Sequence, residues 1–496
     1  MGIIQRQTIK GSLYSYIGAI LGFVNVAILS PKIFSTDQIG LTQVLVSIAT
    51  IISQLGTLGF NNVTIRLFPY FRSGDRNHKG FPFLMFLVGL TGFALSIVFF
   101  IFLRTYFIES NLEKSALLSR YIDLLIPLIL VTLAHSLFDT YNRVLYNATF
   151  GTFMKEVVVR VANLAVILLY YFDFISFSVY IYAYVAILGL PPLFILILWL
   201  IRGELSLKAD WSVMTPSFRK EVIIVAVYGI IAGMSGIALI NIDKYMVNEY
   251  LGLSAAGIYS IAFYFGTLIQ IPNRAMSKIS STVLAESWKA GDRDSILNLY
   301  RHSSLNQFVI GGWLFLGVVV NLNNIFHLLP PEYSTGKWVI ILISAANLII
   351  MMSGMSTQII ATSSAYKWQN WLMIILIVLV VLTNMIFIPL YGLTGAALAS
   401  FISTLITSLI RFIIIWKLYG FQPYSLRFLY LSIIILAVFL ASSFIPETFY
   451  LYDLLIRSTV MSVLYFGLIR LFRISDYPLE VVKGLYNAMT DKTKRS

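Results

Sequence analysis

Long apolar runs separated by short polar segments recur along the whole chain. A helix that crosses a membrane needs about 20 successive apolar residues. Runs of that length lie near residues 13–33, 41–60, 81–103, 121–142, 154–172, 176–201, 222–242, 253–272, 306–326, 338–360, 368–389, 394–416, 426–445 and 454–472. Breaks such as "FRSGDRNHKGF" and "IPLYGLTG" separate them, although only "DFIS" stands between the fifth and the sixth. The pattern predicts an all-α integral membrane protein with about fourteen transmembrane helices.

Composition strengthens this prediction. The 496 residues are 58% hydrophobic and only 11% charged, whereas charged residues make up roughly a quarter of a soluble domain. The first apolar run is too long for the core of a secretory signal, and no small-residue cleavage site follows it, so we expect it to be retained as a span. The chain has no cysteine, which excludes disulfides, thiolate zinc sites and cysteine nucleophiles.

The positions of the basic residues orient the predicted helices, because Lys and Arg stay on the cytoplasmic side. With the N-terminus inside, 28 of the 35 Lys and Arg residues fall in inside segments and 7 in outside segments. The bias predicts that both termini are cytoplasmic. It also accounts for most of the formal net charge of +13, so we expect no nucleic-acid partner.

Two similar segments indicate an internal repeat. "FSTDQIGLTQVLVSIATIISQLGTLGF" follows the first span and "LGLSAAGIYSIAFYFGTLIQIP" the seventh; their glycines, Gly40 and Gly257, are 217 residues apart. Six spans fit in that interval, so the repeats would share one orientation. We therefore expect two six-helix lobes around a central cavity, plus two extra C-terminal helices. The predicted divisions are an N-terminal lobe (1–205), a C-terminal lobe (206–420), the extra helix pair (421–473) and a cytoplasmic tail (474–496).

Enzyme chemistry is not evident in the sequence. The four histidines, at positions 78, 135, 302 and 327, do not pair at metal-ligand spacing, and no P-loop for ATP is present. We therefore expect no catalytic residue, no metal and no cofactor. The stretches 276–300 and 474–496 are amphipathic, which predicts that they lie at the cytoplasmic membrane interface.

Five basic residues lie at the predicted cytoplasmic ends of spans. Ionisable groups at such positions are costly in free energy unless they are paired or hydrated. A ring of guanidinium groups suits an anionic substrate, since arginine binds phosphate oxygens in a bidentate fork. The alternative is that these side chains anchor the protein at lipid head groups. The candidates for the substrate diphosphate and the cavity are Arg66, Arg143, Lys155, Arg160 and Arg274.

Three further charged residues are candidates for gating or coupling. Asp139, expected to be the deepest acid, lies four residues before Arg143, on one helical face. It can therefore pair with Arg143, or alternatively serve as a proton or cation site. Asp243 and Lys244 end the seventh span toward the predicted outer face.

Several segments together resemble a known family. The longest is "NIDKYMVNEYLGLSAAGIYSIAFYFGTLIQIPNRAMSKISSTVLAE", with its acid–base pair Asp243–Lys244 and the run Ala256–Ser260. "IPLYGLTGAALASFIST" (388–404) and "FSTDQIGLTQ" followed by "LGTLGF" add to it. They resemble the polysaccharide transporter family, the oligosaccharide flippases of the multidrug/oligosaccharidyl-lipid/polysaccharide exporter superfamily. The resemblance extends over nearly the whole chain in length, span count and order.

The resemblance implies a function and a location. Such proteins move undecaprenyl-diphosphate-linked oligosaccharides, the repeat units of O-antigen, capsule or exopolysaccharide, to the outer leaflet of the bacterial cytoplasmic membrane. The resemblance implies alternating access driven by an H+ or Na+ gradient or by the membrane potential. The implied partners are the lipid-linked substrate, membrane lipids, and a polysaccharide polymerase or glycosyltransferases. The two extra spans would form a groove for the polyprenyl tail, by analogy.

Other functions remain open at this stage. A multidrug or cation extruder of the same superfamily usually has twelve spans and buried acids, which fits less well. A lipid II flippase shares the span count and the cationic cavity, and only its substrate separates it. A membrane scaffold, a glycosyltransferase or a polymerase fits least, because the outer loops are short; the longest is predicted near residues 104–120.

Overall fold

The chain folds into two compact helical units. The computed structural model describes residues 3–75, 77–111 and 114–475, and every regular element in these ranges is helical. Unit 1 comprises Met1–Ile261 with Met373–Ala396, and unit 2 comprises Ala262–Leu372 with Ala397–Ser496. This division rests on packing and not on the repeat, so the lobe boundaries given above stay predictions. The predicted amphipathic tail, 474–496, lies almost entirely outside the described residues.

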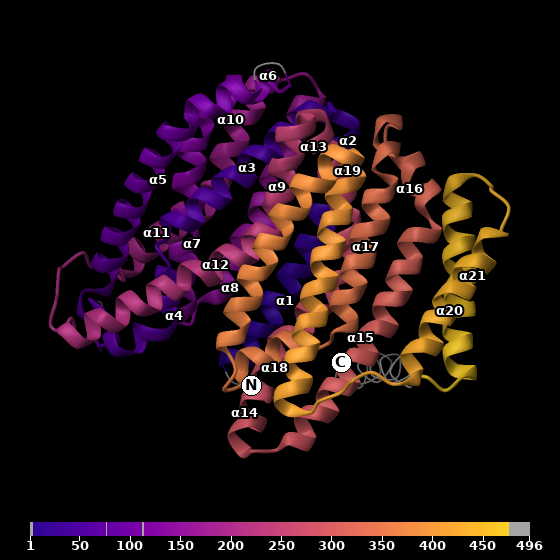
Figure 1. Ribbon diagram of the computed structural model, residues 1–496. Helices are drawn as coiled ribbons and strands as arrows, with labels where there is room; N and C mark the ends of the chain where they lie inside the picture. The colour runs from indigo at the N-terminus through magenta and orange to yellow at the C-terminus, as the bar shows by residue number, and fades with distance from the viewer. Residues whose placement is uncertain (1–2, 76, 112–113, 476–496) are drawn as a thin grey trace, which may run out of the picture. The chain divides into compact units, whose positions relative to one another are not determined.

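Unit 1 contains the first twelve α-helices (Figure 1). They are α1 (Ile3–Gly22), α2 (Ser30–Ile33), α3 (Thr36–Gly56), α4 (Phe60–Phe71), α5 (Phe81–Asn111), α6 (Ala116–Tyr121), α7 (Leu125–Val144), α8 (Ala148–Phe153), α9 (Val159–Tyr171), α10 (Phe177–Leu188), α11 (Leu190–Arg202) and α12 (Pro216–Leu251). Two π-helical segments, η1 (Phe23–Leu29) and η4 (Met154–Val158), interrupt the first and fifth predicted spans. Short 3-10 turns, η2 (His78–Gly80) and η3 (Ile122–Leu124), precede α5 and α7.

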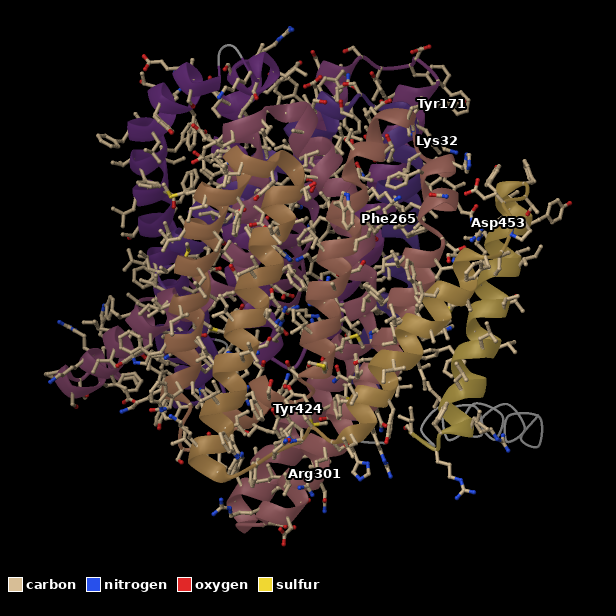
Figure 2. The ribbon with its side chains drawn as sticks, turned by 45° about the vertical axis from the view of Figure 1, so that its right-hand side comes forward. Lys32, Tyr171, Phe265, Arg301, Tyr424 and Asp453 are labelled. Atoms are coloured by element: carbon tan, nitrogen blue, oxygen red, sulfur yellow. The ribbon has the colours of Figure 1, made fainter. Side chains whose placement is uncertain are left out.

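Unit 2 contains most of the later helices. They are α14 (Ile271–Ala290), α15 (Arg293–Val320), α16 (Leu322–Leu328), α17 (Lys337–Met352), α18 (Ser356–Thr362), α20 (Leu426–Ser443) and α21 (Tyr450–Leu471), with the 3-10 turns η5 (Leu268–Gln270) and η6 (Pro331–Gly336). α13 (Leu253–Thr267) and α19 (Lys367–Tyr419) have residues in both units. The amphipathic stretch 276–300 forms a helical hairpin of α14 and α15 that turns at Gly291, with φ 71°. Within unit 2, Arg301 and Tyr424 lie near the hairpin end and Asp453 near the opposite end (Figure 2).

The predicted membrane spans coincide with helices. Eleven helical stretches of the described residues are long and apolar enough to cross a membrane. One of them, α19, contains a break at Gly392 (φ 57°, ψ −134°), where the sequence places a boundary between two spans. The fifth and seventh predicted spans fall on η4 with α9 and on α12. The prediction of an all-α, multi-pass membrane protein is confirmed.

Much of the predicted outer connection near residues 104–120 is helical, and its place outside the membrane stays a prediction. α5 continues to Asn111 and α6 begins at Ala116. With 31 residues, α5 is about 46 Å long at 1.5 Å per residue, longer than the ~30 Å hydrocarbon core. Its polar C-terminal turns can therefore extend into water without breaking the helix, which the apolar pattern could not show.

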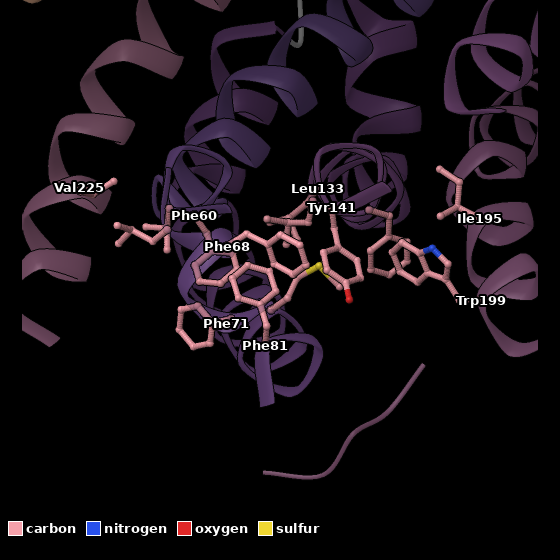
Figure 3. Close-up of a cluster of buried hydrophobic side chains, with 14 residues drawn as sticks. Phe60, Phe68, Phe71, Phe81, Leu133, Tyr141, Ile195, Trp199 and Val225 are labelled. Atoms are coloured by element: carbon pink, nitrogen blue, oxygen red, sulfur yellow. The ribbon is translucent and has the colours of Figure 1, made fainter. Parts of the chain in front are cut away.

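An aromatic cluster holds α4 in place within unit 1 (Figure 3). Gly59, with φ 70°, turns the chain between α3 and α4. Phe68 of α4 packs edge-on against Phe81 and Tyr141, with ring centroids 5.1 and 5.5 Å apart. Tyr141 in turn packs against Trp199 at 5.2 Å. Such edge-to-face pairs add stability beyond their buried area, so they hold α4 against its neighbours in unit 1.

The N-terminal turns of α3 and α13 cross closely at the two repeat glycines. A Cβ atom on Gly40 would lie 2.0 Å from the Leu253 carbonyl oxygen, and one on Gly257 would lie 2.1 Å from the Thr36 carbonyl oxygen. The hydroxyls of Thr36 and Ser254 are 2.7 Å apart beside this crossing. Thr36 and Leu253 are 217 residues apart, like the glycines. The two close contacts would be equivalent under the repeat, which stays a prediction.

Candidate functional site

Asp139 and Arg143 form the predicted ion pair on α7. The Asp139 carboxylate is buried, while the Arg143 side chain remains 62% exposed and donates to Asp139 Oδ2. Gly151 of α8 approaches the same carboxylate so closely that a Cβ atom there would lie 2.0 Å from Oδ1. The pair is thus enclosed on one side by α8 and open on the other. The alternative role of Asp139 as a proton or cation site stays a prediction.

Arg160 links α9 to α1. Its guanidinium pairs with Glu156 at 2.7 Å and also donates to the carbonyl of Gly18. The amide of Asn25, in η1, donates to the Arg160 carbonyl at 2.8 Å. All of these contacts lie within unit 1. The Glu156 carboxylate and the Gly18 carbonyl therefore compensate the charge of Arg160.

The remaining basic candidates differ in environment. Arg66 on α4 and Lys155 on η4 are exposed, and neither forms an ion pair in the part of the chain that the structure describes. The backbone of Arg274 lies in α14, and its side chain is outside the described residues. Because α14 belongs to unit 2 and the other four residues to unit 1, the predicted ring stays a prediction.

Asp243 lies at the centre of a buried polar network in unit 1. Its side chain is fully buried, so Asp243 and not Asp139 is the more deeply buried acid. The Tyr259 hydroxyl donates to Oδ2 at 2.9 Å, and the Asn384 amide donates to Oδ1 at 2.6 Å. These contacts join α12, α13 and the first half of α19 through one carboxylate.

Lys244, the neighbour of Asp243, contacts a different helix. Its ammonium donates to the Gln43 Oε1 atom of α3 at 2.8 Å. A buried carboxylate and a buried ammonium are stable only with such hydrogen bonds and an opposite charge nearby. The adjacent charges meet that condition, and they make the network sensitive to the loss of either one.

Sequence reasoning missed the partners of Asp243. Tyr259 and Asn384 are 16 and 141 residues away from it in the chain. The available signal was Asn384 itself, which stands in the apolar run "VVLTNMIF". A polar side chain inside a span normally faces the protein interior and finds a partner there.

A second buried ion pair, in unit 2, was also missed. Asp453 and Arg457 of α21 are joined by a 2.6 Å contact, with side chains only 5% and 10% exposed. Arg457 also donates to the carbonyls of Ser442 and Ile445 at 3.0 and 2.7 Å, at the C-terminal end of α20. Asn324 of α16 donates to Asp453 Oδ2 at 2.6 Å. The i,i+4 spacing that pointed to Asp139 and Arg143 was present here too.

No protein-family model and no curated protein sequence matches the chain. The structure of "Lipid II flippase MurJ, inward closed conformation" is similar, with a TM-score of 0.69 and 15% identity, over 94% of this chain and 98% of that one. A MATE in complex with MaL6 has a TM-score of 0.54 and 12% identity, over 84% and 96% of the two chains. An outward-facing multidrug resistance MATE transporter of the MOP superfamily has a TM-score of 0.53 and 13% identity, over 84% and 95%.

These identities show the fold. The chain has the fold of the MurJ and MATE structures. The family, the superfamily and the expectation that the chain is not an enzyme stay predictions. The similarity to MurJ extends over a larger share of the chain than the similarity to the MATE proteins, 94% against 84%.

Proposed function

We propose that this protein is a flippase that moves undecaprenyl-diphosphate-linked oligosaccharide, an O-antigen, capsule or exopolysaccharide unit, across the bacterial cytoplasmic membrane by alternating access. The observation that carries the proposal is the similarity to the lipid II flippase MurJ over 94% of the chain. A lipid-linked substrate accords with that neighbour. Both termini would be cytoplasmic, as the bias of Lys and Arg residues predicts.

The basic residues at the inner ends of the helices would receive the diphosphate. Arg66 and Lys155 have exposed side chains without an ion-pair partner among the described residues of unit 1, so they would meet an anion entering from the cytoplasm, whereas Arg143 would have to exchange Asp139 for it. Arginine contributes two parallel hydrogen bonds to a phosphate and lysine a compact charge. Arg274 would contribute from α14, and Arg160 would act by positioning α1 against α9.

The buried network around Asp243 would couple transport to an ion gradient or to the membrane potential. Protonation of the carboxylate, or binding of Na+ beside it, would weaken the hydrogen bonds from Tyr259 and Asn384. Those bonds join three helices, so a change in one charge would alter their packing. Lys244 would take part as the adjacent positive charge, and Asp139 is the alternative coupling residue.

A multidrug or cation extruder is the second candidate function. Two observations favour it: the similarity to MATE proteins over 84% of the chain, and the fully buried Asp243, since a buried carboxylate can exchange a proton for a cation. A lipid II flippase is the third candidate, and it differs from the proposed function only in the glycan carried.

Deletion of the gene tests these functions against one another. The surface polysaccharide and the lipid-linked oligosaccharides of the membrane would be measured together. We expect surface glycan to be lost and undecaprenyl-linked repeat units to accumulate on the cytoplasmic face, with recovery when the gene is restored. Unchanged glycan with greater sensitivity to cationic drugs would refute the flippase and favour the extruder. Arrest of cell-wall synthesis with intact surface glycan would favour lipid II.

A further inference from the structure

Unit 1 contains a partly enclosed pocket that none of the roles above uses. Its empty volume is about 420 Å³, part of which is open to the outside. It lies between α3, α9, α10 and the segment from η1 to α2, and Ile261 of α13 closes one side. None of its lining residues is charged. The residues that carry the argument are Phe34, Gln38, Gln43, Asn163, Tyr180 and Tyr184.

One wall of the pocket is aromatic. The rings of Phe34 and Tyr180 are 4.5 Å apart, and behind them the ring of Tyr170 stacks on Phe34 at 4.9 Å with an interplanar angle of 5°. Tyr184 stacks on Tyr180 one turn further along α10, at 6.1 Å. The mutual packing fixes these rings, so they present a rigid apolar surface with phenolic hydroxyls at its edge.

Three amide side chains also line the pocket, those of Gln38, Gln43 and Asn163. Gln38 accepts from the Ser35 backbone N–H at 3.0 Å, which orients its side chain. The Lys244 ammonium donates to the Gln43 oxygen at 2.8 Å. The Gln43 nitrogen can therefore donate to a ligand. The Asn163 Oδ1 atom is buried and has no hydrogen-bond partner among the described residues. A buried acceptor of this kind needs a donor.

The pocket also lies next to a π-helical segment, η1. Val26 of η1 and Ser30 of α2 line it, and η4 leads directly into α9, which supplies Asn163. Segments of π-helix are rare and often mark functional sites, because they break the regular hydrogen-bond ladder.

We propose that this pocket binds one pyranose ring of the transported glycan. This inference rests on the proposed function and identifies where the sugar is recognised. A pyranose has apolar C–H faces that pack on aromatic rings and hydroxyls around its edge that pair with amides and phenols. A sugar hydroxyl would donate to Asn163 Oδ1, and the Gln43 nitrogen would donate to another sugar oxygen. The absence of any lining carboxylate, with Lys244 directly behind Gln43, opposes a cationic drug.

The position of the pocket fits the exit of the glycan. Lys32 and Tyr171 flank the pocket residues in the sequence and lie at one end of unit 1 (Figure 2). The charge pattern assigns that end to the outside of the membrane. The sugar would therefore occupy the pocket late in transport, after the diphosphate has left the basic residues at the inner end.

The test measures sugar binding to the full-length protein in lipid nanodiscs. Saturation-transfer NMR would be recorded with methyl glycosides of a neutral hexose, an N-acetylhexosamine, a 6-deoxyhexose and a uronic acid, and with tetraphenylphosphonium as a cationic probe. We expect ring C–H signals from at least one glycoside with the unaltered protein. Asn163→Leu and Tyr184→Leu should each weaken the binding about tenfold, a difference of about 1.4 kcal/mol. Asn163 Oδ1 has no partner to lose, so its replacement should leave folding intact.

Tyr182→Leu is the matched control, because Tyr182 lies on the same helix, is 60% exposed and is not part of the pocket. Its binding signals should not change. The pocket assignment is overturned if no glycoside gives a signal, if all three variants lose binding equally, or if only tetraphenylphosphonium binding responds to the pocket variants. If the pocket variants lose sugar binding but deletion of the gene leaves every glycan unchanged, the flippase function is refuted and sugar binding by the pocket is supported. If the pocket variants still transport glycan and bind sugar normally, sugar binding by the pocket is refuted and the flippase function is supported.

Discussion

The buried ion pair of α21 allows a quantitative prediction about stability. Arg457 makes three contacts: to Asp453, to the Ser442 carbonyl and to the Ile445 carbonyl. Arg457→Ala removes all three and leaves a 5% exposed carboxylate for which Asn324 is the only side-chain donor among the described residues. Leaving one charge of a buried pair without its partner lowers the free energy of unfolding by about 3–5 kcal/mol. We expect a loss in that range, with α20 and α21 loosened first.

An exposed pair in unit 1 provides the control. Arg104 contacts the two Asp123 oxygens at 2.8 and 3.0 Å, similar in distance to the buried pair, but the side chains are 43% and 62% exposed. Arg104→Ala should therefore lower the free energy of unfolding far less than Arg457→Ala, because water screens an exposed pair. Both substitutions remove an arginine from an ion pair with aspartate, but only Arg457 is buried and also donates to two backbone carbonyls.

The assay is reversible unfolding in mixed micelles by titration with a denaturing detergent, followed by tryptophan fluorescence. A double variant, Asp453→Leu with Arg457→Met, should recover most of the loss, because it removes both charges and keeps the volume. If Arg457→Ala and Arg104→Ala cost the same, burial does not determine the effect. If the double variant is as unstable as Arg457→Ala, the uncompensated charge is not the cause, and the reasoning fails.

Three further predictions concern helix crossing, coupling and substrate binding. Gly40→Ala should destabilise the protein by about 1–3 kcal/mol through overpacking, because its Cβ atom would lie 2.0 Å from a carbonyl oxygen; Gly467→Ala, where nothing lies within 4 Å, should not. Asp243→Asn should abolish the dependence of glycan transport on the ion gradient while the protein stays folded, measured in proteoliposomes; unchanged gradient dependence would exclude Asp243 as the coupling residue. Arg66→Ala and Arg274→Ala should each reduce surface glycan without reducing the amount of inserted protein, and normal glycan in both would refute the basic ring.

The spans could be predicted from the sequence because the membrane imposes a length and an apolar composition on each helix. Helix ends beyond the hydrocarbon are free of that constraint, so the apolar pattern could not show that α5 continues to Asn111. The boundary at Gly392 was visible because glycine and proline stand together in "IPLYGLTG". The helix segments inside the hydrocarbon can therefore be predicted from the sequence, whereas the lengths of the helix ends beyond it cannot.

In the candidate site, contacts between residues close in the chain could be predicted, and contacts between distant segments could not. The pair of Asp139 and Arg143 was predictable, since four residues make one helical turn. The contact of Asp243 with Asn384, 141 residues away, depends on how separate helices pack, and no local pattern contains it. The pocket residues Phe34 and Asn163 are likewise distant in sequence. Asn163, an amide inside a span, was a signal in the sequence, but only the fold brings it together with Phe34, which follows the end of the first span.

The contacts in the structure also separate the charged residues by role. Arg160 has a carboxylate partner within the fold, so its removal mainly loosens α9 from α1. Arg66 and Lys155 have no ion-pair partner in the described ranges, so the folded state loses little without them. An anion that binds an uncompensated cation gains the full interaction, whereas it must displace the existing carboxylate from a paired one. Substitution of Arg66 or Lys155 should therefore reduce transport more than stability, and substitution of Arg160 should do the reverse.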